Sequence, residues 1–259
     1  MKEAVILEKK ETIARLILNR PENRNALSLE VMGQMREKLE EIRADSSIRV
    51  LIIKGEGPVF CAGHHLKELC SDNPDIHHLR NIFSVCSKMM QTLHELPQPV
   101  IAQVHGIATA AGCQLVAACD LAIAESGARF AVPGVKIGVF CSTPMVPLSR
   151  VIGRRRALDM LLSGRFISAQ EAMDFGLING MTDAEHLEEE TQKRAEEIAQ
   201  FSRFTLSFGK QTFYRQIDLH ESAAYDYAQE AIVMNCLTGD GQEGIRAFLE
   251  KRKAEWKNR

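Results

Sequence analysis

The sequence lacks several features that would indicate particular classes of protein. It has no uninterrupted apolar run of the roughly 18 residues that a membrane-spanning helix needs. Its net charge of −2 gives no general attraction to nucleic acid or to an anionic membrane. The N-terminus lacks the cationic and then apolar pattern of a secretory signal. We therefore expect no nucleic-acid partner and no membrane partner.

Disulfide and metal-binding patterns are also missing. The seven cysteines are an odd number and form no Cys-x-x-Cys pair, which fits reduced thiols better than a disulfide framework. Two adjacent histidine pairs occur, at His64-His65 and His77-His78, but neither has the spacing of a zinc motif. We expect no metal site. We also expect a cytoplasmic location, or the mitochondrial matrix for a processed eukaryotic chain.

The apolar pattern of the first half predicts an α/β fold. Apolar runs without a helical period predict strands at 5–7, 13–18, 50–53, 100–104 and 121–124. The period of three to four residues, together with capping and stop signals, predicts helices at 29–42, 75–94 and 112–119. The alternation of strands and helices favours parallel strands joined by crossover helices.

The last third of the sequence has a different, mainly helical character. After a capped helix in "SAQEAMDFG" (168–176), helices are predicted at 185–200, 206–216, 221–237 and 241–253. We therefore divide the chain into a core of residues 1–200 and a helical region of residues 201–259. The helical region is expected to pack on the core and on neighbouring subunits.

Two junctions between a strand and a helix stand out. They are "GPVFCAGHHLKEL" (57–69) and "VHGIATAAGCQL" (104–115). Small residues after a strand let the backbone approach a ligand closely, and free N–H groups at a helix start stabilise negative charge. Two such junctions side by side could direct two donors at one oxyanion. Taken singly, either motif is better explained by glycines that serve only a tight turn.

Five stretches in the same order carry a family resemblance. They are "NRPENRNAL", "FCAGHHLKEL", "PVIAQVHGIATAAGCQLVAACDLAIA", "GRFISAQEAMDFGLIN" and "AFLEKRKAEWK". Together they resemble the crotonase superfamily of enoyl-CoA hydratases and isomerases along nearly the whole chain. The stretches "FCSTP" (140–144) and "DGQEGIRAFLEKRK" are most similar to one branch of it. The resemblance implies the ClpP-like crotonase spiral of ββα repeats, with C-terminal helices that join subunits into a homotrimer or homohexamer.

The resemblance also implies a site for an acyl-CoA or enoyl-CoA thioester. The family holds the thioester oxygen with two backbone N–H groups, which by position belong to His64 and Ala111. Coenzyme A is part of the substrate, so no separate cofactor is implied. Contacts to coenzyme A fall on the loop residues Arg24, Ala62, His64, Leu66 and Lys67, and on Phe248 and Lys251 of a neighbouring subunit. For Lys67 and Lys251 the alternative is a solvated surface charge.

The chain departs from the family at the catalytic acids. Family hydratases use two glutamates, and the matching positions here hold Gln114 and Gly134. Neither residue can exchange a proton near neutral pH. Loss of one positioned acid–base group costs about 10²–10⁴ in rate. We therefore expect slow hydration of an enoyl-CoA, which the double change Gln114→Glu and Gly134→Glu should raise.

Three functions stay open from the sequence. The first is an enzyme of the hydratase/isomerase family, formally a lyase, that acts on acyl-CoA in fatty acid metabolism. The second is a decarboxylase or isomerase, for which His64 is the candidate, since decarboxylating relatives have a histidine there. The third is an acyl-CoA-binding protein without catalysis. Cys141 is interpreted as a buried apolar residue, and His105 and Asp120 as structural hydrogen-bonding residues.

Overall fold

A computed structural model describes residues 3–258 of the chain. Its main sheet has six strands in the order β1-β2-β3-β4-β6-β9, in which β1 and β2 pair antiparallel and the following pairs are parallel. These strands are β1 (Val5–Lys10), β2 (Ile13–Leu18), β3 (Val50–Gly55), β4 (Val100–Val104), β6 (Leu121–Glu125) and β9 (Gly180–Thr182). A second sheet contains β5 (Ile107–Thr109), β7 (Arg129–Ala131) and β8 (Ile167–Ser168). The predicted α/β class is confirmed.

Helices connect the strands and form the C-terminal part of the chain. They are α1 (Leu29–Ala44), α2 (Leu66–Leu69), α3 (Ile76–Glu95), α4 (Ala111–Ala118), α5 (Met145–Ile152), α6 (Arg154–Ser163), α7 (Ala169–Phe175), α8 (Leu187–Ala199), α9 (Arg203–Gln216), α10 (Glu221–Leu237) and α11 (Gly239–Leu249). Short 3₁₀ helices lie at Pro21–Asn23, Pro133–Ile137 and Ala184–His186. The described residues contain no helix both long and apolar enough to cross a membrane.

The predicted helix starts rest on side-chain caps. Ser28 accepts a hydrogen bond from the N–H of Val31 at the start of α1, and Asp75 caps α3 in the same way. A capping box between Ser168 and Glu171 begins α7, which ends at Gly176 with a left-handed backbone. These caps satisfy N–H groups that have no partner inside the helix. The predicted helices that begin near residues 29, 75 and 168 are confirmed.

The apolar core lies on both faces of the main sheet. The larger cluster contains the inward side chains of β2, β3 and β4 together with those of α1, α3 and α4. A smaller cluster under α8 includes Ile52, Ile101 and Leu187 on the opposite face. Burial on both faces explains why β3 and β4 are almost uniformly apolar.

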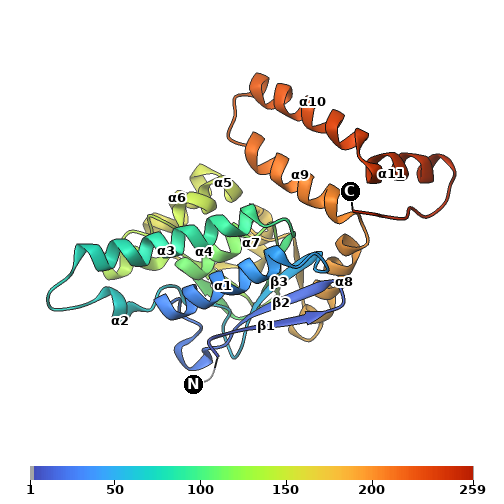
Figure 1. Ribbon diagram of the computed structural model, residues 1–259. Coiled ribbons are helices and arrows are strands. Elements are labelled where there is room, and N and C mark those ends of the chain that lie inside the picture. The colour runs from blue at the N-terminus through green and yellow to red at the C-terminus, as the bar shows by residue number, and fades with distance from the viewer. Residues whose placement is uncertain (1–2, 259) are drawn as a thin grey trace.

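The C-terminal helices form an arm that stands away from the sheet. Figure 1 shows α10 and α11 at the far end of the molecule from α2, with α9 between them and the core. Apolar side chains on α10 and α11 are unusually exposed: Ile232, Val233, Met234, Leu237, Ile245, Phe248 and Leu249. Helix α8 ends at Ala199 and α9 begins at Arg203, so the proposed domain boundary at residue 200 lies in this connection.

Several boundaries differ from the sequence predictions. β1 runs to Lys10, so the hairpin turn is only Glu11 and Thr12, with Glu11 in a left-handed conformation. The last helix ends at Leu249 rather than at Lys253. Helices α5 and α6 and the strands of the second sheet were not predicted individually. Those strands are three residues long or shorter, which is too short to show a period.

Candidate active site

Backbone pairing fixes the first junction against the loop before α1. The N–H of Ala62 donates to the carbonyl of Arg24 at 3.0 Å, and the N–H of Leu27 donates to the carbonyl of Gly63 at 2.7 Å. The N–H of His65 donates to the carbonyl of Leu27 at 3.2 Å. In such a parallel bridge the flanking residues carry the hydrogen bonds, so the N–H of His64 itself points away from Leu27.

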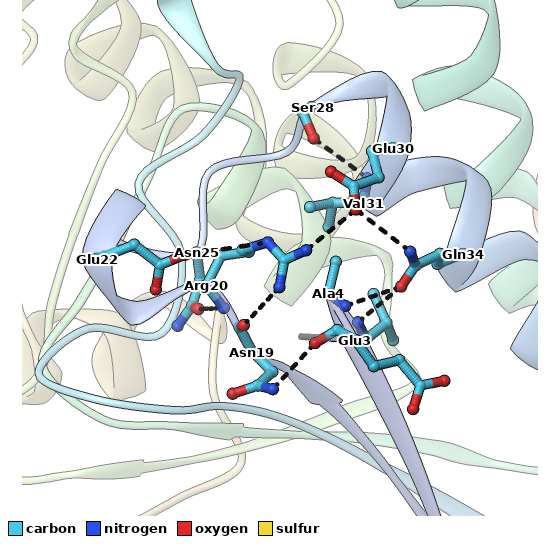
Figure 2. Close-up of polar contacts among 11 residues, drawn as sticks. Glu3, Ala4, Asn19, Arg20, Glu22, Asn25, Ser28, Glu30, Val31 and Gln34 are labelled. Carbon is cyan, nitrogen blue, oxygen red and sulfur yellow. Dashed lines mark hydrogen bonds and ion pairs between the residues drawn. The ribbon is translucent and has the colours of Figure 1, made fainter. Parts of the chain in front are cut away.

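Asn25 holds that loop in place. Its side-chain oxygen accepts from the N–H of Arg20 at 2.9 Å, and its amide nitrogen donates to the carbonyls of Glu56 and Val59. Figure 2 shows the neighbouring guanidinium of Arg20, which forms an ion pair with Glu30 at 3.0 Å. Asn25 is 1% exposed and has φ 52°, a conformation that asparagine tolerates better than most residues. The "NRPENRNAL" stretch is therefore a fixed support for the first junction.

The two junctions are in direct contact. A Cβ on Gly63 would lie 2.8 Å from the Cβ of Ala110 and 3.3 Å from the nitrogen of Ala111. A Cβ on Gly112 would lie 2.2 Å from the carbonyl oxygen of Cys61, so glycine is required there. Ala110, just before α4, has φ 50° and ψ −118°, which is strained for a residue with a side chain.

Two adjacent backbone donors remain unused at this contact. Within residues 3–258, neither the N–H of His64 nor that of Ala111 donates a hydrogen bond. Ala111 is the first residue of α4, where the helix dipole favours negative charge, and the whole of α4 is buried. The structure thus brings together the two positions predicted from the resemblance, and the geometry suits an oxygen that gains negative charge.

Gln114 lies on the same helix face as Ala111, because the two are three positions apart in the helix. Its side chain is part of a residue only 3% exposed, and its Oε1 has no hydrogen-bond partner in the described part of the chain. Side chains in a helix lean towards its N-terminus. This general preference favours the first turn of α4, where the N–H of Ala111 is unused, as the direction of the amide.

The imidazole of His64 is held in an apolar environment. Its ring contacts that of Phe83 edge to face, with centroids 5.2 Å apart. Among residues 3–258, its Nε2 has no partner. Burial lowers the pKa of His64 to about 4 from its ordinary value of 6.5, so the ring is neutral at neutral pH.

Gly134 lies under a closed loop. Its N–H donates to Cys141 Sγ at 3.3 Å, and its carbonyl accepts from the N–H of Val139 at 3.0 Å. A Cβ on Gly134 would lie 2.3 Å from the carbonyl oxygen of Val139 and 2.8 Å from Cys141 Sγ. A side chain at residue 134 therefore requires this loop to shift, and the expected gain in hydration from Gly134→Glu stays a prediction.

The cysteines agree with the reduced, structural interpretation. All seven are free, and Cys141 is 8% exposed. Burial raises the pKa of the Cys141 thiol, which keeps it protonated at neutral pH. The part of the chain that the structure describes contains no group of three His, Cys, Asp or Glu residues placed to hold a metal ion.

The residues expected to contact coenzyme A fall into two distant groups. Arg24 and Lys67 are exposed beside the first junction, and Leu66 begins α2 with 58% exposure. Phe248, 84% exposed, and Lys251 lie at the end of α11, at the opposite end of the molecule (Figure 1). One chain does not bring these groups together, so a shared site needs a neighbouring subunit and stays a prediction.

His105 and Asp120 have the structural roles expected from the sequence. His105 Nε2 lies 2.8 Å from the carbonyl oxygen of Gly57. Asp120 accepts from the N–H of Val100 at 2.6 Å and from the hydroxyl of Tyr214 at 2.8 Å, and it pairs with Lys210 at 2.7 Å. The sequence interpretation missed Lys210 and Tyr214, although their spacing of four residues on one helix face was a usable signal.

Comparison with known proteins identifies the family of the chain. The profile described as enoyl-CoA hydratase/isomerase matches residues 8–259. The mitochondrial enoyl-CoA hydratase domain-containing protein 3 of Danio rerio is 46% identical over 254 residues, which covers 98% of this chain and 87% of the relative.

Solved structures agree as well. The human enoyl-CoA hydratase domain-containing protein 3 superposes with a TM-score of 0.95 at 43% identity, covering 98% of this chain and 100% of that one. An enoyl-CoA hydratase of Mycobacterium smegmatis superposes with a TM-score of 0.95 at 42% identity, covering 98% of each chain. The predicted crotonase fold is thereby confirmed. The chain belongs to the enoyl-CoA hydratase/isomerase family of the crotonase superfamily, in which it resembles the branch of enoyl-CoA hydratase domain-containing protein 3.

Proposed function

We propose that this chain acts on an acyl-CoA thioester in fatty acid metabolism and holds the thioester oxygen between the N–H groups of His64 and Ala111. The observation that carries the proposal is the pair of unused donors at two junctions in direct contact. Donors fixed in place before the reaction stabilise an enolate without reorganisation, which is often the largest part of catalysis.

The same site lacks groups for moving a proton to or from water. Gln114 has no titratable proton, Gly134 has no side chain, and the imidazole of His64 is neutral. Two missing acid–base groups, each worth about 10²–10⁴ in rate, reduce water addition far below the level of an ordinary hydratase. We therefore propose slow hydration of crotonyl-CoA beside good binding of acyl-CoA.

Two other functions follow from the same residues. Acyl-CoA binding without catalysis is favoured by the neutral pair of Gln114 and His64. Decarboxylation or isomerisation needs an enolate stabiliser and not two glutamates, so the paired N–H groups support it too. A turnover screen over crotonyl-CoA, 3-enoyl-CoA and malonyl-type thioesters separates these functions from hydration.

A change in the ligand tests the oxygen contact directly. We compare by calorimetry the binding of butanoyl-CoA with that of its S-butyl thioether, which has no carbonyl oxygen. Two hydrogen bonds of about 1 kcal/mol each predict that the thioether binds at least about tenfold more weakly. Equal affinities would overturn the assignment of the two N–H groups.

A second pair of ligands tests the contacts to the coenzyme. Arg24 and Lys67 are exposed cations next to the first junction, and charged hydrogen bonds to phosphate are strong. Acyl-CoA should therefore bind more tightly than the same acyl group on pantetheine. Equal affinity would overturn the proposed contacts to phosphate but not the proposed contact to the thioester oxygen.

We further propose a homotrimer or homohexamer. The exposed apolar residues of α10 and α11, among them Leu237 and Phe248, need a partner surface. Light scattering that reports one monomer mass at all concentrations would contradict this. The branch relatives of Danio rerio and Homo sapiens are named as mitochondrial proteins, which supports a mitochondrial location over the cytoplasm for this chain.

A further inference from the structure

We propose that Thr109 is a positioning residue whose hydroxyl sets the spacing between the two N–H donors of His64 and Ala111. This inference rests on the proposed function, because it assumes that both donors bind one thioester oxygen. It adds the side chain that fixes the relative position of these donors, which acts through the backbone of the first junction.

The first observation is where the backbone pairing between the two junctions ends. The N–H of Cys61 donates to the carbonyl of Ile107 at 3.2 Å, and the N–H of Thr109 donates to the carbonyl of Cys61 at 3.0 Å. The next N–H, that of Ala62, donates instead to the carbonyl of Arg24 at 3.0 Å. Within residues 3–258, no backbone hydrogen bond joins the junctions any closer to the two donors.

The second observation is that the hydroxyl of Thr109 supplies the next contact. Its Oγ1 donates to the carbonyl of Ala62 at 3.0 Å, and no backbone N–H within residues 3–258 donates to that carbonyl. Threonine is β-branched and has few side-chain rotamers, so the direction of the hydroxyl is restricted. Ala62 lies two residues before His64, and Thr109 lies two residues before Ala111. The bond therefore joins the two junctions at equal distances along the chain from the two donors.

The third observation is the backbone freedom of Gly63. Its φ of 95° lies in a region that glycine adopts easily, so this residue adds little stiffness. The peptide after Gly63 carries the N–H of His64, and its carbonyl accepts from the N–H of Leu27 at 2.7 Å. The peptide before Gly63 is held by Thr109. Without the hydroxyl, the donor of His64 would follow the loop of Leu27 and lose this polar link to the second junction.

The experiment measures how well the two donors act together. Calorimetry on the full-length protein compares butanoyl-CoA with its S-butyl thioether, which has no carbonyl oxygen. Thr109→Val keeps the β-branched shape and removes the hydroxyl. We expect the native preference for the thioester, at least about tenfold, to fall by about threefold or more, because a displaced donor forms a poorer hydrogen bond. The affinity for the thioether should stay within about twofold of the native value, since the thioether makes no bond to these donors.

The infrared stretching band of the bound thioester carbonyl gives a second measurement. Hydrogen bonds from the two donors should lower this frequency in the native protein, and the lowering should be smaller in Thr109→Val. A purely structural role for Thr109 would weaken the binding of both ligands alike and leave the carbonyl frequency of the bound thioester unchanged.

Matched variants assign the effect to the hydroxyl of Thr109. Thr109→Ser restores a hydroxyl and should return the preference to near the native value. Thr191→Val is the control, because the buried hydroxyl of Thr191 also donates to a carbonyl, that of Leu187 at 2.7 Å. This bond lies in α8 on the opposite face of the main sheet, so the variant should keep the native preference.

Thr109→Ala is the second variant if Thr109→Val does not fold, and the same fall in preference is expected. The inference is overturned if the variants without the hydroxyl keep the native preference, if Thr109→Ser lacks it, or if Thr191→Val lowers it equally. Equal weakening of both ligands by Thr109→Val also overturns it, while the native preference would still support the proposed oxygen contact. If the native protein binds both ligands equally, the proposed function fails and this inference fails with it.

Discussion

Lys210 anchors the C-terminal arm to the core, and its replacement should be strongly destabilising. Its side chain is 7% exposed and its Nζ lies 2.7 Å from a carboxylate oxygen of Asp120. The same Nζ donates to the carbonyls of Leu93 and Gln98 at 2.7 and 2.9 Å, near the end of α3. Lys210→Met keeps much of the apolar stem but removes all three contacts.

The expected loss of unfolding free energy depends on the contacts that Asp120 keeps in the Lys210→Met variant. Removing one partner of a buried ion pair costs about 3–5 kcal/mol. Asp120 would keep its hydrogen bonds from Val100 and Tyr214, which reduces the penalty for its charge. Burial also lowers the pKa of Lys210, so the native pair does not fully compensate the desolvation of the ammonium. We therefore expect a loss of about 3 kcal/mol, at the lower end of this range.

The assay is urea unfolding followed by far-ultraviolet circular dichroism at one protein concentration, because an oligomer gains stability with concentration. Lys193→Met on the exposed face of α8 is the control and should change the unfolding free energy by less than about 0.5 kcal/mol. Adding Asp120→Asn to Lys210→Met should recover part of the loss, since it removes the unpaired charge. A loss for Lys210→Met no larger than that of the control would refute the reasoning.

Three further predictions concern the two junctions. Gly112→Ala should lower the unfolding free energy in urea by about 1–3 kcal/mol, because the added Cβ would collide with the carbonyl of Cys61. The same change should weaken butanoyl-CoA binding. Unchanged stability and affinity would contradict this close contact. Ala110→Gly should raise the stability by about 1 kcal/mol, as relief of the strain at φ 50° exceeds the entropy cost of glycine; a lower melting temperature would show that the strain is absent. His64 should make the native protein lose stability as the pH falls from 6.5 towards 4, because the unfolded chain binds the proton at the higher pH. The loss reaches up to about 2 kcal/mol at pH 5, and unfolding curves of His64→Phe should lack it.

Much of the local structure follows from the sequence because its causes are local. The cap at Ser28 and the capped start at Ser168 are visible in the sequence as side chains that compete for backbone N–H groups. The apolar runs of β3 and β4 show burial on both faces directly. The two junctions and the non-ionisable Gln114 and Gly134 were also identified from residue order and family resemblance.

The contacts between segments distant in sequence were decided only by the tertiary structure. Gly63 and Ala111 meet because the two junctions pack together, and nothing near either residue encodes that distance. The loop that fills the space at Gly134 and the anchor between Lys210 and Asp120 are likewise long-range contacts. The sequence alone determined which chemical groups this site contains, because side-chain chemistry belongs to each residue. The fold decided which of them meet and which lack a partner, because distance, burial and unsatisfied hydrogen bonds arise only from packing.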